Sequence, residues 1–119
     1  MIDDHAFIQK MLVSLLFKLG FETVHVAENG QEGLDQCRLN NPSLILCDIE
    51  MEPVDGLEFR KKLRKAKEIK CWNAPVIFLT SHGEAAIVGK AIKYGACGYL
   101  LKPVSMVQLK KHVKQALGF

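Results

Sequence analysis

Three short apolar runs dominate the folding pattern of this 119-residue sequence, and each run leads into a polar side chain. They lack the alternation of apolar and polar residues that marks a half-exposed strand, so we expect strands covered on both faces. A sheet of such strands is parallel and flanked by helices. The runs and the polar residues that close them are Leu44–Cys47 with Asp48, Pro75–Thr80 with Thr80 itself, and Cys97–Leu101 with Lys102.

Segments with helical periodicity alternate with these strands. Apolar residues from Phe7 to Leu19 recur every three or four positions, and Gly20 ends the pattern. The segment Glu22–Ala27 alternates and is predicted as a further strand. The whole pattern predicts one α/β domain over residues 1–119, with a doubly wound parallel sheet and right-handed crossovers. The other predicted helices are Gln31–Leu39, Leu57–Lys67, Glu84–Tyr94 and Ser105–Leu117, the last with Ser105 as its N-cap.

Composition excludes several classes of protein. The chain is 49% apolar and 24% charged, as expected of a globular domain. No apolar run is long enough to span a membrane and no signal peptide opens the sequence, which favours the cytoplasm. No two cysteines have C-x-x-C spacing, so we expect reduced, mostly buried thiols rather than a zinc site or disulfides. The cysteines are Cys37, Cys47, Cys71 and Cys97.

The net charge is +3, and the basic residues gather in Arg60–Lys70 and Lys110–Lys114. Such clusters are compatible with a nucleic-acid patch. No aromatic residues interleave with them, however, and both segments also carry apolar residues at core spacing. We therefore interpret them as solvated helix faces and expect no direct nucleic-acid binding.

Polar residues at the carboxyl ends of the predicted strands form the candidate site. In a parallel α/β sheet ligands bind at this edge, where Asp48, Thr80 and Lys102 would meet the acidic pair Asp3–Asp4. Several carboxylates in one pocket repel one another, and Mg²⁺ is a hard cation that resolves the repulsion. A lysine and a hydroxyl bind phosphoryl oxygens, and a carboxylate can itself become an aspartyl-phosphate. The pattern therefore predicts a phosphoryl acceptor beside a metal.

The sequence resembles the receiver domain of bacterial two-component response regulators, the family that includes the chemotaxis receiver. The resemblance spans nearly the whole chain and implies a flavodoxin-like (βα)5 fold with strand order 2-1-3-4-5. The matching motifs are Asp3–Asp4, the Asp48–Gly56 loop, Thr80–Ser81, Gly95–Tyr99 and Lys102–Pro103.

The resemblance also implies a role for each matching residue. Asp48 would be the phosphoacceptor, and Mg²⁺ would be held by the side chains of Asp3, Asp4 and Asp48 and the backbone carbonyl of Glu50. The remaining roles are a phosphoryl-sensing switch at Thr80 and Ser81, an aromatic reporter at Tyr99, a phosphoryl-binding ammonium at Lys102 and a cis peptide bond before Pro103.

The implied partners act before and after the phosphoryl group arrives. The donor would be a phosphohistidine on a sensor histidine kinase or a histidine phosphotransfer protein. The readout would be an output domain or downstream protein, engaged through the surface of Glu84–Tyr94, Cys97–Leu101 and Ser105–Leu117.

Two features depart from the family pattern. In the loop after Asp48, Pro53 lies one place late and Glu52 takes the usual proline position. We expect altered loop rigidity without loss of chemistry. Glu50 and His82 occupy positions that tune the lifetime of the phosphoryl group in the family, and the alternative is that both side chains point into solvent.

The second departure is the start of the chain, where only Met1 and Ile2 precede the acidic pair in place of a full strand. Either upstream residues complete that strand, which we favour, or a neighbouring chain fills the gap in a rearranged or swapped homodimer. We expect structural roles for the remaining histidines, which are His5, His25 and His112.

Two other functions compete with a phosphoacceptor. A pseudo-receiver would use the same fold only as a protein-interaction module, and the intact set Asp48, Thr80 and Lys102 argues against it. A phosphatase of the haloacid dehalogenase type needs a second aspartate two residues after the nucleophile, where this chain has Glu50. We therefore expect a chain that supports its own phosphorylation without being an enzyme in the usual sense.

Overall fold

The computed structural model describes residues 1–49, 55–80 and 98–118. The predicted helix Glu84–Tyr94 lies outside these residues, as do Glu50, Ser81 and His82. None of the described helices is long and apolar enough to cross a membrane. The described helices are α1 (Ala6–Lys18), α2 (Gly30–Asn40), α3 (Gly56–Lys65) and α5 (Met106–Leu117).

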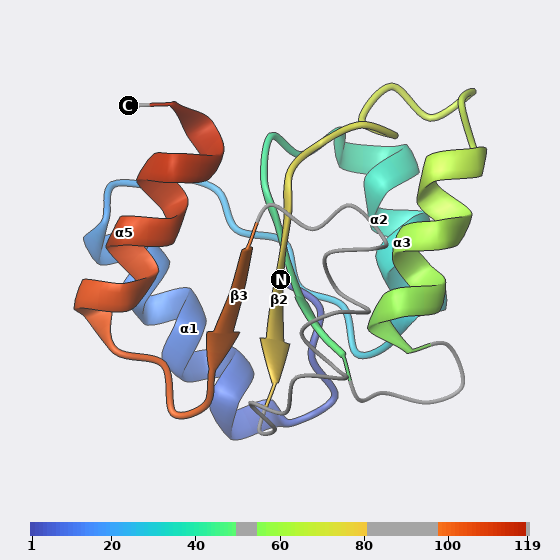
Figure 1. The fold of residues 1–119 in the computed structure, drawn as a ribbon. Helices are drawn as coiled ribbons and strands as arrows, with labels where there is room; N and C mark the ends of the chain where they lie inside the picture. The colour runs from blue at the N-terminus through green and yellow to red at the C-terminus, as the bar shows by residue number, and fades with distance from the viewer. Residues whose placement is uncertain (50–54, 81–97, 119) are drawn as a thin grey trace.

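The apolar runs form the predicted parallel sheet. Its strands β1 (Ile45–Asp48), β2 (Val76–Thr80) and β3 (Gly98–Leu101) lie in the order β1-β2-β3. β1 pairs with β2 so that Asp48 lies opposite Leu79, and β2 pairs with β3 so that Thr80 lies opposite Leu101. The three strands therefore end together, at one edge of the sheet (Figure 1).

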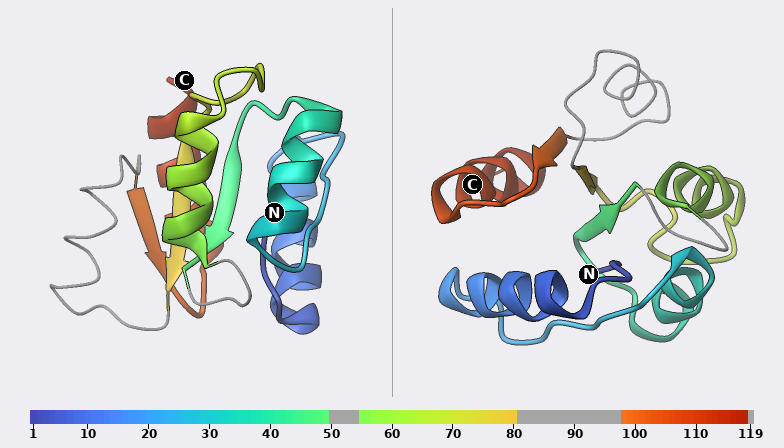
Figure 2. Two further views of the ribbon diagram at one scale, coloured as in Figure 1. Left: turned by 90° about the vertical axis from the view of Figure 1, so that its right-hand side faces the viewer. Right: turned by 90° about the horizontal axis from the view of Figure 1, so that it is seen from below.

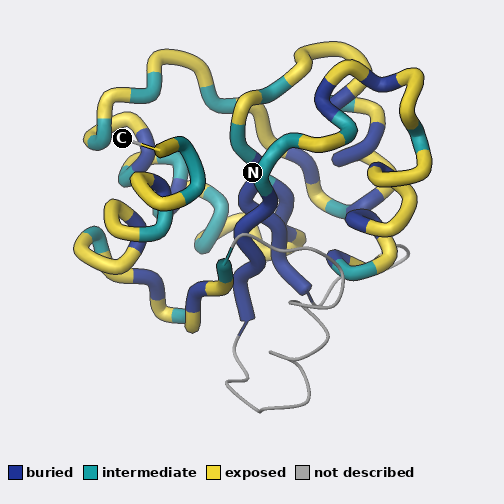
Figure 3. The backbone as a smooth tube through the Cα atoms, turned by 45° about the horizontal axis from the view of Figure 1, so that its top comes forward, coloured by how far each residue is buried: buried dark blue, intermediate teal, exposed yellow. Residues whose placement is uncertain are grey.

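Helices cover both faces of this sheet, as the doubly wound architecture requires. α1 and α5 lie on one side and α2 and α3 on the other (Figures 1 and 2). Alternate strand residues supply the two cores: Leu46 and Ile77 pack with α1 and α5, while Cys47 and Phe78 pack with α2 and α3. Every residue of β1 and β2 is buried, which explains why their sequence is apolar without alternation (Figure 3).

Side-chain caps set the starts of three helices. Ser105 accepts a hydrogen bond from the Gln108 backbone N–H, which confirms its prediction as an N-cap. Asn29 and Asp55 cap α2 and α3 in the same way. Each cap satisfies a backbone donor that the helix itself leaves unpaired.

The described cysteines are free thiols, as predicted. Cys37, Cys47 and Cys71 are buried and unpaired by disulfides. Burial raises the pKa of Cys37 to about 12 and also raises the pKa values of Cys47 and Cys71. These thiols therefore stay protonated and serve as small apolar groups in the core beside α2 and α3.

The predicted strand Glu22–Ala27 does not form, and this is a correction to the sequence interpretation. Only Ala27 makes a β-bridge, and its partner is Ile2. Ile2 also bridges Cys47 of β1. Ala27, Ile2 and β1 therefore lie side by side, as the predicted order 2-1-3-4-5 requires, but the first two positions in this order are each represented by a single bridging residue. A strand needs partners along its length, and among the described residues Ile2 makes the single bridge to this segment.

A short parallel ladder marks where a longer strand would run. The Met1 amino group donates to His25 O at 3.0 Å, Ala27 N to Met1 O at 2.9 Å and Asp3 N to Ala27 O at 3.0 Å. On the other side Ile2 N donates to Leu46 O at 2.8 Å. Next to this ladder lies a groove of about 350 Å³, lined by Met1 and Ile2 and by residues 23–27 and 42–46.

We predict that a β-forming extension ahead of Met1 will stabilise the protein. About five valine and isoleucine residues, the usual length of a strand, would continue the ladder into the groove. Each side chain buried there is worth roughly 1.5–3 kcal/mol, so the free energy of unfolding is expected to rise by several kcal/mol. Urea titration of the extended and original chains measures the change.

A glycine-serine extension of the same length is the matched control for this comparison. It can form the same backbone bonds but buries little apolar surface, and it should give little stabilisation. Equal unfolding midpoints for the two extensions would contradict the assignment of the groove as a strand site.

Candidate functional site

Two aspartates are buried at the carboxyl edge of the sheet, and the backbone fixes both. Asp48 ends β1, and its N–H donates to Ile2 O at 2.9 Å. Asp3 follows Ile2 in the bridge between β1 and Ala27. Asp48 is 1% exposed and Asp3 is fully buried. Unpaired carboxylates are costly in such a place, so the structure must supply positive charge nearby.

Lys102 supplies one positive charge to this pair. The residue follows β3, and its backbone N–H donates to Thr80 O at 2.8 Å. Its ammonium Nζ lies 3.0 Å from Asp48 Oδ2 and 3.3 Å from Asp3 Oδ2, with the side chain only 10% exposed. Burial alone would lower the pKa of Lys102, but the hydrogen bond and charge of Asp48 and the charge of Asp3 outweigh it and raise the pKa.

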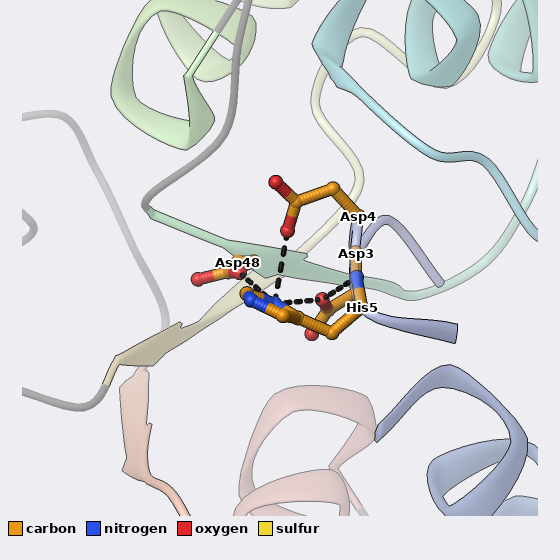
Figure 4. A group of neighbouring side chains, drawn as sticks. All are labelled: Asp3, Asp4, His5 and Asp48. Atoms are coloured by element: carbon orange, nitrogen blue, oxygen red, sulfur yellow. Dashed lines mark hydrogen bonds and ion pairs between the residues drawn. The ribbon is translucent and has the colours of Figure 1, made fainter. Parts of the chain in front are cut away.

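His5 brings a ring nitrogen to the same cluster. Its Nδ1 lies 3.0 Å from Asp4 Oδ1, 3.2 Å from Asp3 Oδ1 and 3.8 Å from Asp48 Oδ2. Figure 4 shows the imidazole among the three carboxylates, which come from the turn before α1 and from the end of β1. The sequence analysis assigned His5 a structural role at the start of the first helix, and the structure adds its contacts with the three carboxylates.

The chemistry of this cluster fits a divalent cation. One ligand atom from each of Asp3, Asp4, His5 and Asp48 lies within 4.8 Å of the others. The three carboxylates and the Lys102 ammonium together carry a formal charge of −2. Asp3 Oδ2 is buried, and its contact with the Lys102 ammonium at 3.3 Å is an ion pair without hydrogen-bond geometry. Carboxylate oxygens are the ligands that Mg²⁺ prefers, so these residues can hold it.

The structure places the other predicted site residues that it describes. Thr80 is buried at the end of β2, one strand away from Asp48. Tyr99 lies on β3 and is 37% exposed. The Lys102–Pro103 peptide bond is cis, as the resemblance implied. Glu50, Ser81 and His82 lie outside the described residues, so their predicted roles remain predictions.

The involvement of His5 could have been inferred from one local signal. The structure makes His5 the N-cap of α1, where Ser, Thr, Asp or Asn is usual. A histidine at this position caps a helix poorly, but directly after two aspartates its ring nitrogen can contact their carboxylates. Metal-binding motifs are usually recognised by fixed spacings of ligands within one helix or loop, and His5 has no such spacing to another histidine or cysteine.

Comparison with known proteins identifies the family. The chain matches the family model described as the response regulator receiver domain over residues 1–114. It therefore belongs to the response regulator receiver domains, which act in two-component signal transduction, and its fold is the flavodoxin-like receiver fold.

Similar proteins include receivers that stand nearly alone and receivers that are part of longer regulators. The chain is 31% identical over 117 residues to the chemotaxis protein CheY of Bacillus subtilis, which covers 98% of this chain and 94% of CheY. It is 34% identical over 116 residues to the transcriptional regulatory protein SrrA of Staphylococcus aureus, but it spans only 46% of SrrA. A crystal structure of a response-regulator candidate from Chloroflexus aurantiacus matches with a TM-score of 0.89 at 30% identity, covering 99% of this chain and 94% of that one.

Gly56 is predicted to be indispensable for the position of Asp48. A Cβ on Gly56 would lie 2.3 Å from Asp48 O and 2.9 Å from Ile49 Cα, so the backbone would have to shift. Gly56→Ala should lower stability by about 1–3 kcal/mol, the usual cost of overpacking. Chemical denaturation measures the loss.

Gly33→Ala in α2 is the matched control for this prediction. Its Cβ would meet side chains rather than backbone, at 2.4 Å from Ile2 Cδ1 and 3.2 Å from Phe59 Cε1, and alanine is the better helix former. If both substitutions cost the same, close backbone approach is not what requires Gly56.

Removal of the Lys102 charge is predicted to destabilise the fold. Lys102→Met leaves the Asp3 and Asp48 carboxylates buried without their cation, and breaking a buried ion pair costs on the order of 3–5 kcal/mol. Because the folded-state pKa of Lys102 is raised above 10.5, its stabilisation is present below pH 10.5 and lost as pH rises through the folded-state value. Unfolding free energies at neutral pH measure the effect.

Two further variants test the cause. Lys111→Met removes an exposed lysine of α5 and should change stability little. Asp3→Asn combined with Lys102→Met should recover part of the loss, since one buried charge is removed. Failure of the double variant to recover any stability would show that Lys102 acts through packing rather than charge.

Proposed function

We propose that this receiver domain, over residues 1–119, accepts a phosphoryl group on Asp48 from a phosphohistidine of a sensor histidine kinase or histidine phosphotransfer protein. The observation that carries the proposal is the 3.0 Å contact between Lys102 Nζ and Asp48 Oδ2 at the edge where the parallel strands end. A carboxylate meant only to cap a loop has no need of a buried ammonium partner. A carboxylate that becomes an acyl phosphate needs one, because negative charge increases there.

The proposed reaction is a direct phosphoryl transfer. An oxygen of the Asp48 carboxylate attacks the phosphorus, the new O–P bond forms and the N–P bond to the donor imidazole breaks. The donor histidine keeps the electron pair of that bond and takes up a proton. Positioning and charge neutralisation carry catalysis of this kind, because no residue of the acceptor has to form another covalent bond.

Lys102 and the acidic pair have separate tasks in this proposal. Lys102 already lies beside Asp48 Oδ2, and its ammonium would follow the charge onto the phosphoryl oxygens. Asp3, Asp4 and Asp48 would hold Mg²⁺, with the backbone carbonyl of Glu50 as the predicted further ligand. When bound, Mg²⁺ supplies positive charge for the oxygens of the phosphoryl group.

The signal is proposed to leave through β3 and α5. Thr80 and Lys102 are joined by the hydrogen bond from Lys102 N to Thr80 O, so the two groups expected to sense the phosphoryl group are coupled. Tyr99 lies on β3, on the strand that leads to Lys102, and remains partly exposed. We expect its side chain to turn inward when the Thr80 hydroxyl is drawn to the phosphoryl group, which shifts a two-state population. An output domain or downstream protein would read that surface.

The pseudo-receiver alternative predicts a different result at the same residues. A module that only binds partners has no use for a metal requirement at Asp48. The position of Lys102 between Asp48 and Asp3 favours the phosphoacceptor. A haloacid dehalogenase-type phosphatase is not favoured by any described contact.

The test is intact-mass analysis after incubation with Mg²⁺ and acetyl phosphate. We expect the added mass of one phosphoryl group, and its loss in Asp48→Asn and in the presence of EDTA. Asp35→Asn is the matched control, because Asp35 is an exposed aspartate of α2 and should leave labelling unchanged. Labelling that persists in Asp48→Asn would refute the assignment, and no labelling of the original chain would favour the pseudo-receiver.

A further inference from the structure

His5 occupies a capping position without capping the helix. α1 begins at Ala6, and the His5 side chain makes no cap hydrogen bond to it. The ring instead lies over the acidic cluster, with Nδ1 at 3.0 Å from Asp4 Oδ1 and 3.2 Å from Asp3 Oδ1 (Figure 4). A serine or aspartate would serve the helix better, so the helix start does not explain the imidazole.

A tight turn fixes the ring where it is. The His5 backbone N–H donates to Asp3 Oδ1 at 2.8 Å, and Gln9 Nε2 donates to Asp3 O at 3.1 Å. The carboxylate of Asp3 thus contacts both the backbone and the ring of His5. The imidazole reaches the cluster without any change in the backbone.

The dimensions and charge of the cluster suit one ion that takes both oxygen and nitrogen ligands. The four candidate ligand atoms lie within 4.8 Å of one another. Opposite ligands of an octahedral ion with bonds of about 2.1 Å are about 4.2 Å apart, so a contraction of a few tenths of an ångström closes the site. The buried Asp3 Oδ2, whose 3.3 Å contact with Lys102 Nζ lacks hydrogen-bond geometry, belongs to the same carboxylate whose Oδ1 contacts His5 Nδ1.

We propose that His5 Nδ1 is a direct ligand of the divalent cation held by Asp3, Asp4 and Asp48, and that it shifts the preference of this site from Mg²⁺ toward nitrogen-binding metals such as Co²⁺ and Ni²⁺. The inference rests on the metal site of the proposed function and adds that this site discriminates between metal ions. Mg²⁺ gains little from an imidazole in place of water, because it prefers oxygen ligands. Transition metals such as Co²⁺ and Ni²⁺ accept imidazole nitrogen as a ligand, and the affinity of a given site rises from Co²⁺ to Ni²⁺.

The experiment compares Mg²⁺ and Co²⁺ binding to the full chain and to His5→Ser. Serine removes the imidazole and is a preferred N-cap, so the variant should fold. We expect Co²⁺ affinity to fall by at least about tenfold, the lower end of what loss of an orienting group costs a metal site, while Mg²⁺ affinity hardly changes. Titration calorimetry gives the affinities. Proton NMR of the Co²⁺ complex gives a second readout, because a coordinated imidazole has strongly shifted ring signals.

His25→Ser is the matched control, since His25 is exposed and its contact with Met1 is made by its backbone carbonyl, which serine keeps, and it should keep both affinities and the shifted signals. Asp3→Asn should weaken Co²⁺ and Mg²⁺ binding together. Retention of tight Co²⁺ binding in Asp3→Asn would place the ion elsewhere and overturn the inference.

The remaining outcomes separate this inference from the proposed function. If His5→Ser binds both metals more tightly, the ring is a competitor of the ion and the inference fails. If the original chain binds Mg²⁺ and is phosphorylated but His5→Ser does not change selectivity, the inference fails and the proposed function stands. If the original chain binds neither metal, both fail.

Discussion

The burial of two carboxylates beside one ammonium governs the organisation of this molecule. Asp3 and Asp48 are held at the edge of the sheet by backbone hydrogen bonds, so neither can move into solvent without breaking the ladder. Lys102 can reach both only because β3 lies next to β2 and ends at the same edge. The contacts of Lys102 with both aspartates therefore depend on the strand order and the register of the sheet together. A one-residue slip in β3 would remove Lys102 from its position and leave two buried charges unpaired.

Much of the fold was predictable because its strands are buried on both faces. The apolar runs that form β1, β2 and β3 have few other uses in a chain of this length, and the helices between them carry clear periodicity. The strand Glu22–Ala27 was predicted wrongly because alternation measures only the suitability of a segment for a strand. It says nothing about whether a partner lies alongside, and here Ile2 provides only a single bridge.

The part of the site that follows from the order of strands and helices was predictable. Asp48 and Lys102 follow strands that must end at one edge, so their proximity could be inferred from the order of the elements. The contacts of His5 were harder to predict, because they depend on the direction of one side chain at the start of α1, and the one local signal was a histidine at the N-cap directly after two aspartates. Propensity favours another residue there, and the observed orientation brings His5 Nδ1 within 3.2 Å of Asp3 and 3.0 Å of Asp4.

The groove beyond Met1 and the site are coupled through Ile2. Its N–H and C=O join Leu46 and Asp48 of β1, and the next residue, Asp3, donates to Ala27 O. The same two peptide units therefore end the ladder on one side and position the acidic pair on the other. Any segment that fills the groove restrains Ile2 and, through it, the Asp3 carboxylate. Because Lys102 contacts this carboxylate directly, the order of the N-terminal ladder sets how rigidly the phosphoacceptor site is held.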